Sequence, residues 1–211
     1  MAKEKLGIYG GSFSPIHEGH IKSALAFLEV MRLDKLLIVP TANPPHKTVD
    51  GATADQRFEM ARLAFEKEAA YIDGRLEISD FEMKREGKSY TIYTLEHYCS
   101  DDRELYMLVG TDMFLSLHRW YRAEDIFRLC KIVLMRREND VENDVPIEEK
   151  KREYRDRFGA DIYEIKEPPT VISSTELRLR IRLGDESDNL IPPAVKEYIR
   201  KNNLYKNRND N

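Results

Sequence analysis

Short apolar runs alternate with longer stretches of helical periodicity along this 211-residue chain. The runs have the length of buried strands, whereas the longer stretches repeat apolar residues every three or four positions, as amphipathic helices do. The runs predict six strands, at 6–9, 35–39, 76–78, 104–110, 130–135 and 161–165. The periodic stretches predict helices at about 20–32, 53–69, 90–98, 112–117, 124–129, 148–158, 174–183 and 194–201.

This alternation predicts the fold class. Strands separated by helices favour a parallel sheet with right-handed crossovers. We therefore expect an α/β fold, a Rossmann-like, doubly wound and mainly parallel sheet with a small helical C-terminal part. We expect residues 1–206 to form a single domain with a helical C-terminal subdomain at about 168–206, and residues 207–211 to be a polar tail.

Ligands of such sheets bind beyond the carboxyl ends of the strands, and polar clusters follow four of the predicted strands. The most informative is Gly10-Gly11-Ser12-Phe13-Ser14-Pro15-Ile16-His17-Glu18-Gly19-His20. It brings backbone N–H groups, a helix N-terminus and two imidazoles to one point, which suits a polyphosphate. It is neither the GxGxxG fingerprint nor a Walker A loop. A structural histidine pair and a pair of metal ligands are the alternatives for His17 and His20.

The other three clusters each have a functional and a structural interpretation. Asn43-Pro44-Pro45-His46-Lys47 places two basic side chains on a stiff loop, either beside an anion or as a rigid surface turn. Asp112, after Gly110, could bind ribose hydroxyls or act as a helix N-cap. The segment 172–178 offers hydroxyls, N–H groups and a guanidinium to phosphates, or is a plain capped helix.

Two aromatic residues, Trp120 and Tyr121, follow the cluster at Gly110–Asp112. They could form a stacking platform for a flat ring or belong to the core.

Composition narrows the classes of partner. The net charge is −4, so no global field attracts nucleic acid or an anionic membrane. The two cysteines, Cys99 and Cys130, lack metal-site spacing, and we expect both to be buried small hydrophobes without a disulfide. No apolar run approaches the roughly 20 residues of a membrane helix, and the start of the chain lacks a signal-peptide pattern. We expect a cytoplasmic protein without nucleic-acid or membrane partners.

Two motifs carry a resemblance to a known family. Gly-Gly-Ser-Phe-x-Pro-x-His-x-Gly-His, followed much later by Ile-Ser-Ser-Thr-x-Leu-Arg, resembles the nucleotidyltransferase α/β-phosphodiesterase superfamily. Further matches make the chain similar to bacterial nicotinate-nucleotide adenylyltransferases, at 44–47, 89–95, 110–114, 120–121 and 190–195. The resemblance implies adenylyl transfer from ATP to nicotinate mononucleotide with Mg²⁺, giving nicotinate adenine dinucleotide and pyrophosphate in NAD biosynthesis. The single domain would be a nucleotidyltransferase domain, its partners these small molecules, and the chain could form a homo-oligomer.

The resemblance also implies residue roles. The residues implied to bind ATP are Gly10, Gly11, Ser12, His17, His20, Gly110, Asp112, Ile172, Ser173, Ser174, Thr175 and Arg178. Those implied to bind the mononucleotide are His46, Lys47, Thr91, Trp120 and Tyr121. The implied catalytic residues are His17, His20, Lys47 and Arg178. No protein side chain is assigned to a metal.

The chain departs from the family pattern at two places. Ser14 stands where the family usually has Asp, which removes a charge from the first cluster. Arg136-Arg137-Glu138, followed by an acidic stretch through 149, replaces the usual Arg-Pro-Gly. Two other functions stay open: a nucleotidyltransferase of the same superfamily acting on nicotinamide mononucleotide or phosphopantetheine, and a non-catalytic nucleotide-binding regulator.

The implied reaction needs no general base. Its nucleophile is a phosphate monoester with a second pKa of about 6, already largely dianionic at neutral pH. Phosphoryl-type transfer then depends on positioning and on charge stabilisation. We expect His17 and His20 to bind phosphate oxygens without forming a covalent intermediate.

Overall fold

The six predicted strands form one sheet. The computed structural model describes residues 2–45, 49, 51–137, 141–167, 173–185 and 189–206. Within them the strand order is β3-β2-β1-β4-β5-β6, and β1, β4, β5 and β6 pair in parallel. The strands are β1 (Glu4–Gly11), β2 (Lys35–Pro40), β3 (Leu76–Ile78), β4 (Arg103–Gly110), β5 (Cys130–Arg137) and β6 (Ile162–Glu167). This is the order of doubly wound dinucleotide-binding folds, so the predicted fold class is confirmed.

The chain divides into two compact units. Unit 1 comprises the described residues of 1–10, 23–37 and 90–169, and unit 2 those of 11–22, 38–89 and 170–211. Unit 1 holds most of α1 (Glu18–Val30) and also α4 (Thr91–Tyr98), α5 (Thr111–Ser116), η1 (Leu117–Arg119), α6 (Ala123–Leu129), η2 (Val141–Asn143) and α7 (Asp144–Phe158). Unit 2 holds α2 (Ala54–Tyr71), α3 (Phe81–Lys84), α8 (Ser174–Arg182) and α9 (Pro193–Lys201).

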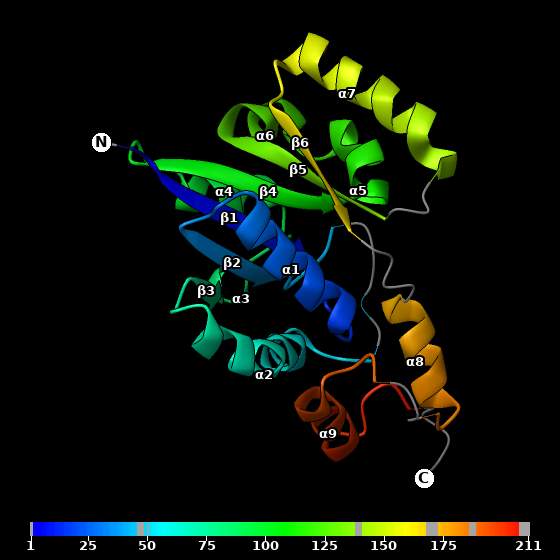
Figure 1. Ribbon diagram of the computed structural model, residues 1–211. Helices are drawn as coiled ribbons and strands as arrows, with labels where there is room; N and C mark the ends of the chain where they lie inside the picture. The colour runs from blue at the N-terminus through cyan, green and yellow to red at the C-terminus, as the bar shows by residue number, and fades with distance from the viewer. Residues whose placement is uncertain are drawn as a thin grey trace. The chain divides into compact units, whose positions relative to one another are not determined.

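The core of unit 1 lies around its central strands. Every residue from Leu105 to Val109 in β4 is at most 4% exposed, as expected for a parallel strand covered on both faces. Helices α5 and α6 pack against β5, and both also contact α7 (Figure 1). This packing makes the carboxyl ends of the strands fixed points from which loops can present side chains.

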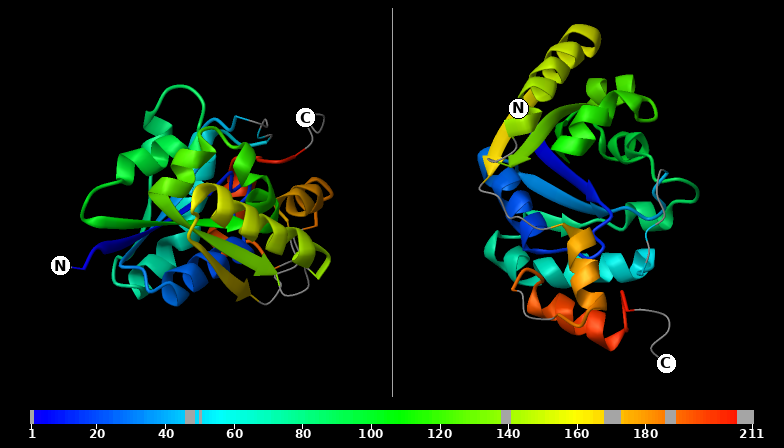
Figure 2. Two further views of the ribbon diagram at one scale, coloured as in Figure 1. Left: turned by 90° about the horizontal axis from the view of Figure 1, so that it is seen from above. Right: turned by 90° about the vertical axis from the view of Figure 1, so that its right-hand side faces the viewer.

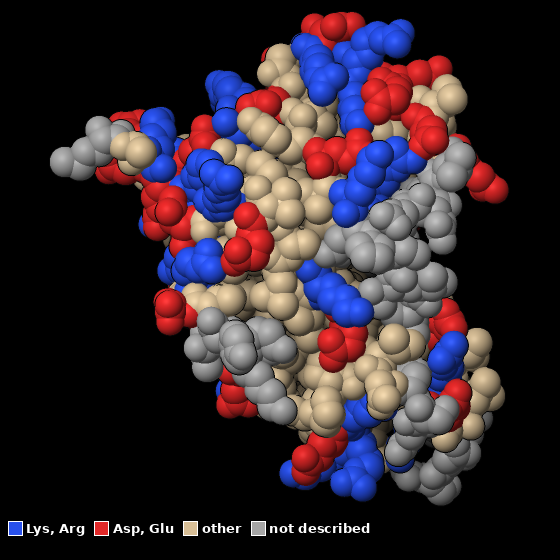
Figure 3. All heavy atoms as spheres, viewed as in Figure 1, with Lys and Arg blue, Asp and Glu red and all other residues tan. Residues whose placement is uncertain are grey.

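Helix α7 begins four residues earlier than the expected Glu148. Pro146 fits its first turn, where a proline removes no helical hydrogen bond, and Asp144 complements the helix dipole. The Arg136 guanidinium binds the carboxylates of Asp144 and Glu164, and therefore ties α7 to the end of the sheet. Over α7, at the top of Figure 3, acidic and basic side chains are interspersed. Arg136, the residue at which this stretch still matches the family pattern, thus anchors the helix.

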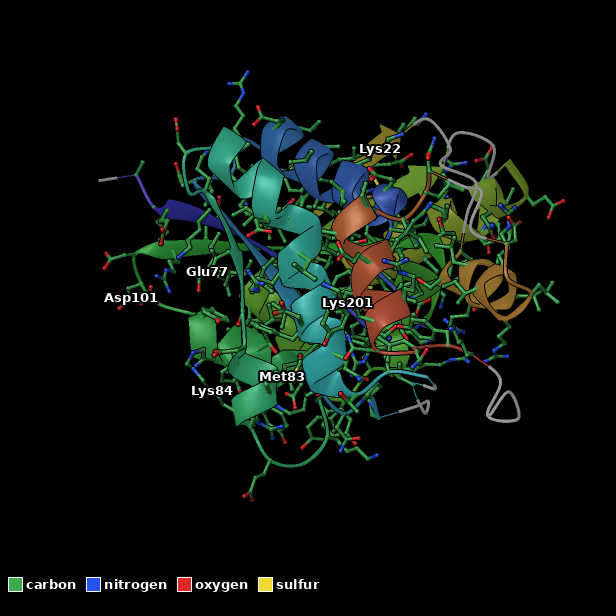
Figure 4. All side chains as sticks on the ribbon, turned by 90° about the horizontal axis from the view of Figure 1, so that it is seen from below. Lys22, Glu77, Met83, Lys84, Asp101 and Lys201 are labelled. Atoms are coloured by element: carbon green, nitrogen blue, oxygen red, sulfur yellow. The ribbon has the colours of Figure 1, made fainter. Side chains whose placement is uncertain are left out.

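In unit 2, α2 packs against α9 and β3. Met60, Ala61 and Phe65 of α2 are buried, as are Val195 and Ile199 of α9. Figures 2 and 4 show α9 lying along α2, and Lys201 marks the last turn of α9.

Helix α3 was not expected from the sequence. It is only four residues long, too short for its periodicity to show. Met83 and Lys84 mark it in Figure 4. Among the described residues, none of the helices is both long and apolar enough to span a membrane.

The two cysteines differ in exposure. Cys130 is buried at the start of β5, as expected. Cys99 is exposed at the C-terminal end of α4, so the expectation that both are buried is wrong for this residue.

Candidate active site

In unit 2, side chains from distant parts of the sequence hold the loop after β1. We call residues 11–17, which begin at the second glycine of the Gly10-Gly11 pair, the glycine-rich loop. Three of its carbonyl oxygens accept side-chain hydrogen bonds. Arg57 Nη1 donates to the Ser12 oxygen over 2.9 Å, and Arg178 Nη1 donates to the Ser14 oxygen over 2.7 Å. Ser174 Oγ donates to the Pro15 oxygen over 3.0 Å. The loop is therefore fixed from two helices, α2 and α8.

The start of this loop leaves no room for a larger residue at Gly11. A Cβ atom there would lie 2.8 Å from the Phe13 ring, closer than real contacts allow. Phe13 itself has a φ of 44°, an uncommon value for a residue other than glycine. Its ring is 2% exposed, so packing holds this strained conformation in place.

The two histidines lie where the loop enters α1. His17 is buried and His20 is half-buried, and their rings stack with centroids 3.7 Å apart. The His17 backbone N–H donates to His20 Nδ1 over 3.3 Å. Because Nδ1 accepts, the neutral His20 ring carries its proton on Nε2. His20 can therefore offer an Nε2–H group to an anion at the helix N-terminus.

The C-terminal motif is built around the start of α8. Ser173 is the N-cap, and its Oγ accepts from the Glu176 N–H over 3.1 Å. Thr175 Oγ1 accepts from Arg178 Nη2 over 3.1 Å. A capping hydroxyl that accepts can still donate its own hydrogen, so capping and phosphate binding are compatible here. Ser174 and Arg178 of this motif also bond to the Pro15 and Ser14 carbonyl oxygens, so the two motifs that carry the family resemblance are in direct contact.

Ser14, the position where the family usually has Asp, has a buried partner. Its side chain is 3% exposed, and its Oγ shares a 3.0 Å hydrogen bond with the Tyr205 hydroxyl. Burial raises the pKa of Tyr205 to about 12, against smaller lowering effects of Ser14 and the nearby Arg178 and Arg57. Gly51 makes room for this tyrosine, because a Cβ atom there would lie 2.6 Å from its ring. The pair fills the position without a charge.

The sequence reasoning missed Arg57 and Tyr205. Arg57 did leave a signal, because it lies on the apolar stripe of α2 with Met60, Ala61 and Ala64. A charged residue on a buried stripe indicates a specific partner. Tyr205 left no comparable signal, since its partner Ser14 is 191 residues away in the sequence.

In unit 1, two predicted residues, Gly110 and Asp112, lie at the carboxyl end of β4 and just after it. Ile8 of β1 is opposite Met107 of β4, so Gly10 and Gly110 follow within three residues of this pair. The strand order reverses between β1 and β4, which is where ligands bind in such sheets. Asp112 is exposed in the first turn of α5, whose N-cap is Gly110. The alternative that Asp112 is the N-cap is therefore wrong.

Three tyrosines of unit 1, Tyr90, Tyr93 and Tyr121, form a half-exposed ring cluster, and Trp120 precedes Tyr121 in the sequence. Tyr121 is 47% exposed and Trp120 is half-buried, so neither is a core residue. The Tyr121 ring lies 4.5 Å from Tyr90 and 6.1 Å from Tyr93 between centroids. A hydrogen bond with Tyr93 raises the pKa of the Tyr121 hydroxyl. Thr91 begins α4 beside Tyr90, and we call Tyr90, Tyr93, Trp120 and Tyr121 the aromatic cluster.

A strained arginine supports this cluster. Arg122 follows Tyr121 with a φ of 55°, and its guanidinium binds Glu96 over 2.8 Å and Asp125 over 2.6 Å. Glu96 belongs to α4 and Asp125 to α6, so Arg122 connects the two helices that flank the cluster.

Three predicted residues, His46, Lys47 and Ile172, lie outside the described residues. Within the described part of the chain, no group of three His, Cys, Asp or Glu side chains is arranged to hold a metal ion.

Comparison with known proteins identifies the class. The family model of cytidylyltransferase-like proteins matches residues 8–180, and the chain belongs to this family. Within it, the chain is 37% identical over 202 residues to a probable nicotinate-nucleotide adenylyltransferase of Caldicellulosiruptor saccharolyticus, covering 96% of this chain and 99% of that protein. A protein of the same description from Clostridium tetani is 34% identical over 206 residues, covering 96% and 100%. The predicted resemblance is confirmed.

A solved structure also shares the fold. The nicotinic acid mononucleotide adenylyltransferase of Plasmodium falciparum, complexed with NaAD, matches with a TM-score of 0.75. The match covers 96% of this chain and 97% of that one at 21% sequence identity. At this identity the likeness establishes the fold alone.

Proposed function

We propose that this protein transfers the adenylyl group of ATP to nicotinate mononucleotide. A phosphate oxygen of the mononucleotide forms a bond to the α-phosphorus of ATP. The bond between that phosphorus and the bridging oxygen breaks, and pyrophosphate leaves with the electron pair. The products are nicotinate adenine dinucleotide and pyrophosphate, as in the reaction that the descriptions of the relatives imply.

The observation that carries this proposal is the convergence of two motifs on the glycine-rich loop. Arg178 and Ser174 bind the carbonyl oxygens of Ser14 and Pro15, which are 164 and 159 residues away in the sequence. The N-terminus of α1 begins at the same loop. Helix N-termini, hydroxyls and a guanidinium together form a strong anion site. Such a site matches the triphosphate of ATP.

In unit 2 we assign the phosphate contacts. His17 and His20 would bind phosphate oxygens at the start of α1 and stabilise the charge that develops as pyrophosphate leaves. The Arg178 guanidinium has five N–H donors, of which the bonds to Ser14 and Thr175 use two. Gly11, Ser12, Ser173, Ser174, Thr175 and Ile172 would complete the triphosphate site. We assign His46 and Lys47 to the mononucleotide phosphate.

In unit 1 we assign the recognition of the two bases and the ribose. Gly10 and Gly110 would allow close approach of the nucleotide, and Asp112 would accept hydrogen bonds from the adenosine ribose. The half-buried Trp120 offers a face for the pyridine ring, and base–aromatic stacking is worth about 1–3 kcal/mol. Thr91 and Tyr121 would contact the nicotinate carboxylate.

The charge balance favours ATP entering as its magnesium complex. Mg²⁺ usually binds through substrate phosphates and few protein carboxylates. The donors around the glycine-rich loop are imidazoles, hydroxyls and a guanidinium, which suit phosphate oxygens. Because the attacking phosphate is already ionised at neutral pH, the protein's contribution is positioning and charge stabilisation.

The test is an assay of pyrophosphate release from ATP with three acceptors in parallel: nicotinate mononucleotide, nicotinamide mononucleotide and phosphopantetheine. We expect the highest kcat/KM with nicotinate mononucleotide and a dinucleotide product of matching mass. Pyrophosphate release with phosphopantetheine alone, or a higher kcat/KM with nicotinamide mononucleotide, would contradict the proposed acceptor substrate. Neither result would contradict membership of the family. ATP binding without any pyrophosphate release would indicate the nucleotide-binding regulator.

Three further expectations stay predictions: a single domain over 1–206, a cytoplasmic location and a homo-oligomer.

A further inference from the structure

Arg57 is the most deeply buried charged side chain among the described residues, at 1% exposure. Its guanidinium bonds to two loops at once. Nη1 donates to the Ser12 oxygen over 2.9 Å, and Nη2 donates to the Ala42 oxygen over 3.1 Å. Ser12 lies in the glycine-rich loop, and Ala42 lies in the segment that leads from β2 toward His46 and Lys47. One side chain therefore connects the two loops to which we assign the two substrate phosphates.

The two loops have further ties around this arginine. The Thr41 N–H donates to the Gly11 oxygen over 2.8 Å, and the Ala42 N–H donates to Glu82 Oε2 over 3.2 Å. Glu82 is itself 9% exposed, and its charge acts on Arg57. Burial lowers the pKa of Arg57, while Tyr205 and Glu82 act in the opposite direction. An arginine remains protonated in proteins, so a full positive charge is held beneath the loops.

A buried charge of this kind is a poor choice for stability alone. Well-packed apolar residues of similar volume are often neutral or stabilising in place of buried ions. What a guanidinium provides is a rigid planar fork whose two ends reach two acceptors at a fixed separation. Lysine has a single flexible ammonium and cannot reproduce that fork.

We propose that Arg57 is a positioning residue that sets the separation between the loop for the ATP phosphates and the loop for the mononucleotide phosphate. This inference rests on the proposed function. Arg57 acts through the Ser12 and Ala42 backbones and contacts neither substrate. Reacting atoms must lie about 3–3.5 Å apart in near-attack geometry, and a displacement of about 1 Å can cost about 10²-fold in rate. A change in the fork would therefore alter turnover more than the binding of either substrate.

The test compares Arg57→Lys with Arg62→Lys. Arg62 is on the same helix, but its side chain is 49% exposed and pairs with Glu59 and Glu66 on the surface of that helix. We expect Arg57→Lys to lower kcat about 10- to 100-fold while the KM of each substrate changes less than about threefold. Arg62→Lys should behave as wild type. A kcat within about twofold of wild type for folded Arg57→Lys would overturn the inference.

A second readout needs no substrate. Amide hydrogen exchange of the full chain should show that Arg57→Lys accelerates exchange in both 11–17 and 41–45, and that Arg62→Lys does not. Acceleration in neither loop, or in only one, would contradict a shared tie. If wild type showed no turnover with nicotinate mononucleotide, the proposed function would fail, yet this exchange comparison would still decide whether Arg57 ties the two loops together.

A milder variant covers the case in which Arg57→Lys does not fold. Glu82→Gln keeps an oxygen acceptor for the Ala42 N–H but removes the carboxylate charge that acts on Arg57. It should change kcat and loop exchange in the same direction, by smaller factors. Unchanged kcat and unchanged exchange at 41–45 would count against the proposal.

Discussion

The glycine-rich loop of unit 2 and the aromatic cluster of unit 1 are supported in opposite ways. The buried side chains of Arg57 and Tyr205 and the half-buried side chain of Arg178 bind the loop. The aromatic cluster is half-exposed and is supported by Arg122, whose guanidinium and two carboxylate partners are themselves partly exposed.

This difference corresponds to two chemical tasks. Stabilising developing charge requires donors that do not move during the reaction, because preorganised dipoles need no reorganisation. Stacking on a flat ring tolerates small adjustments, since it depends on contact area more than on direction. We therefore expect changes at the loop to affect kcat and changes at the cluster to affect the affinity for the pyridine nucleotide.

The largest effect should come from His20→Ala. It removes a phosphate donor at the start of α1, and loss of one such preorganised donor typically costs about 10²–10³ in kcat. His97→Ala is the matched control, because His97 is an exposed histidine of α4 in unit 1. Steady-state rates of pyrophosphate release measure both. Near-wild-type turnover of His20→Ala would remove the histidine from the mechanism.

Trp120→Ala should come next, and its effect should appear in binding. Loss of a stacking face worth about 1–3 kcal/mol corresponds to about a 5- to 150-fold weaker affinity for nicotinate mononucleotide. Trp120→Phe keeps a ring and should lose much less. Calorimetric titration with each substrate separates the cases: an equal loss of ATP affinity would contradict the stacking role.

A smaller effect, on stability, is expected from Tyr205→Phe. It removes the hydrogen-bond partner of the buried Ser14 hydroxyl, and an unsatisfied buried group costs about 1–3 kcal/mol. Ser14→Ala together with Tyr205→Phe should cost less than the sum of the single changes, as measured by urea unfolding. Because the pKa of Tyr205 is raised to about 12, the coupling should be constant from about pH 6 to about pH 9. Additive losses would show that the pair is not coupled.

The smallest effect concerns His118, which lies just before the aromatic cluster. Burial, followed by the charge of Lys150, lowers its pKa below the ordinary value of 6.5. The unfolded chain then binds more protons than the folded chain as pH falls through 6.5 and below, so acidification lowers the free energy of unfolding. The free energy of unfolding of His118→Gln, measured by urea unfolding, should fall less steeply than that of wild type between about pH 7 and about pH 5. Parallel curves for wild type and variant would contradict this contribution.

The sequence predicted the sheet well because its central strands are buried runs whose apolar character is visible locally, as in 105–109. It placed the start of α7 too late, since acidic residues and Pro146 obscure a helix whose first turn accommodates both. It indicated the glycine-rich loop and the α8 motif separately, and their contact required the fold. Arg57 and Tyr205 act over long sequence separations, 45 and 191 residues. The apolar stripe of α2 indicates that Arg57 has a partner but not which one, and Tyr205 has no local signal.

The central claim is that the adenylyl group passes directly from ATP to the phosphate of nicotinate mononucleotide, with the protein stabilising charge and forming no covalent intermediate. The most direct measurement uses an ATP analogue with a single configuration of sulfur at the α-phosphorus and determines the configuration of the dinucleotide product. A single in-line displacement inverts that phosphorus, and the account predicts inversion. Retention would require an intermediate on the protein and would contradict it.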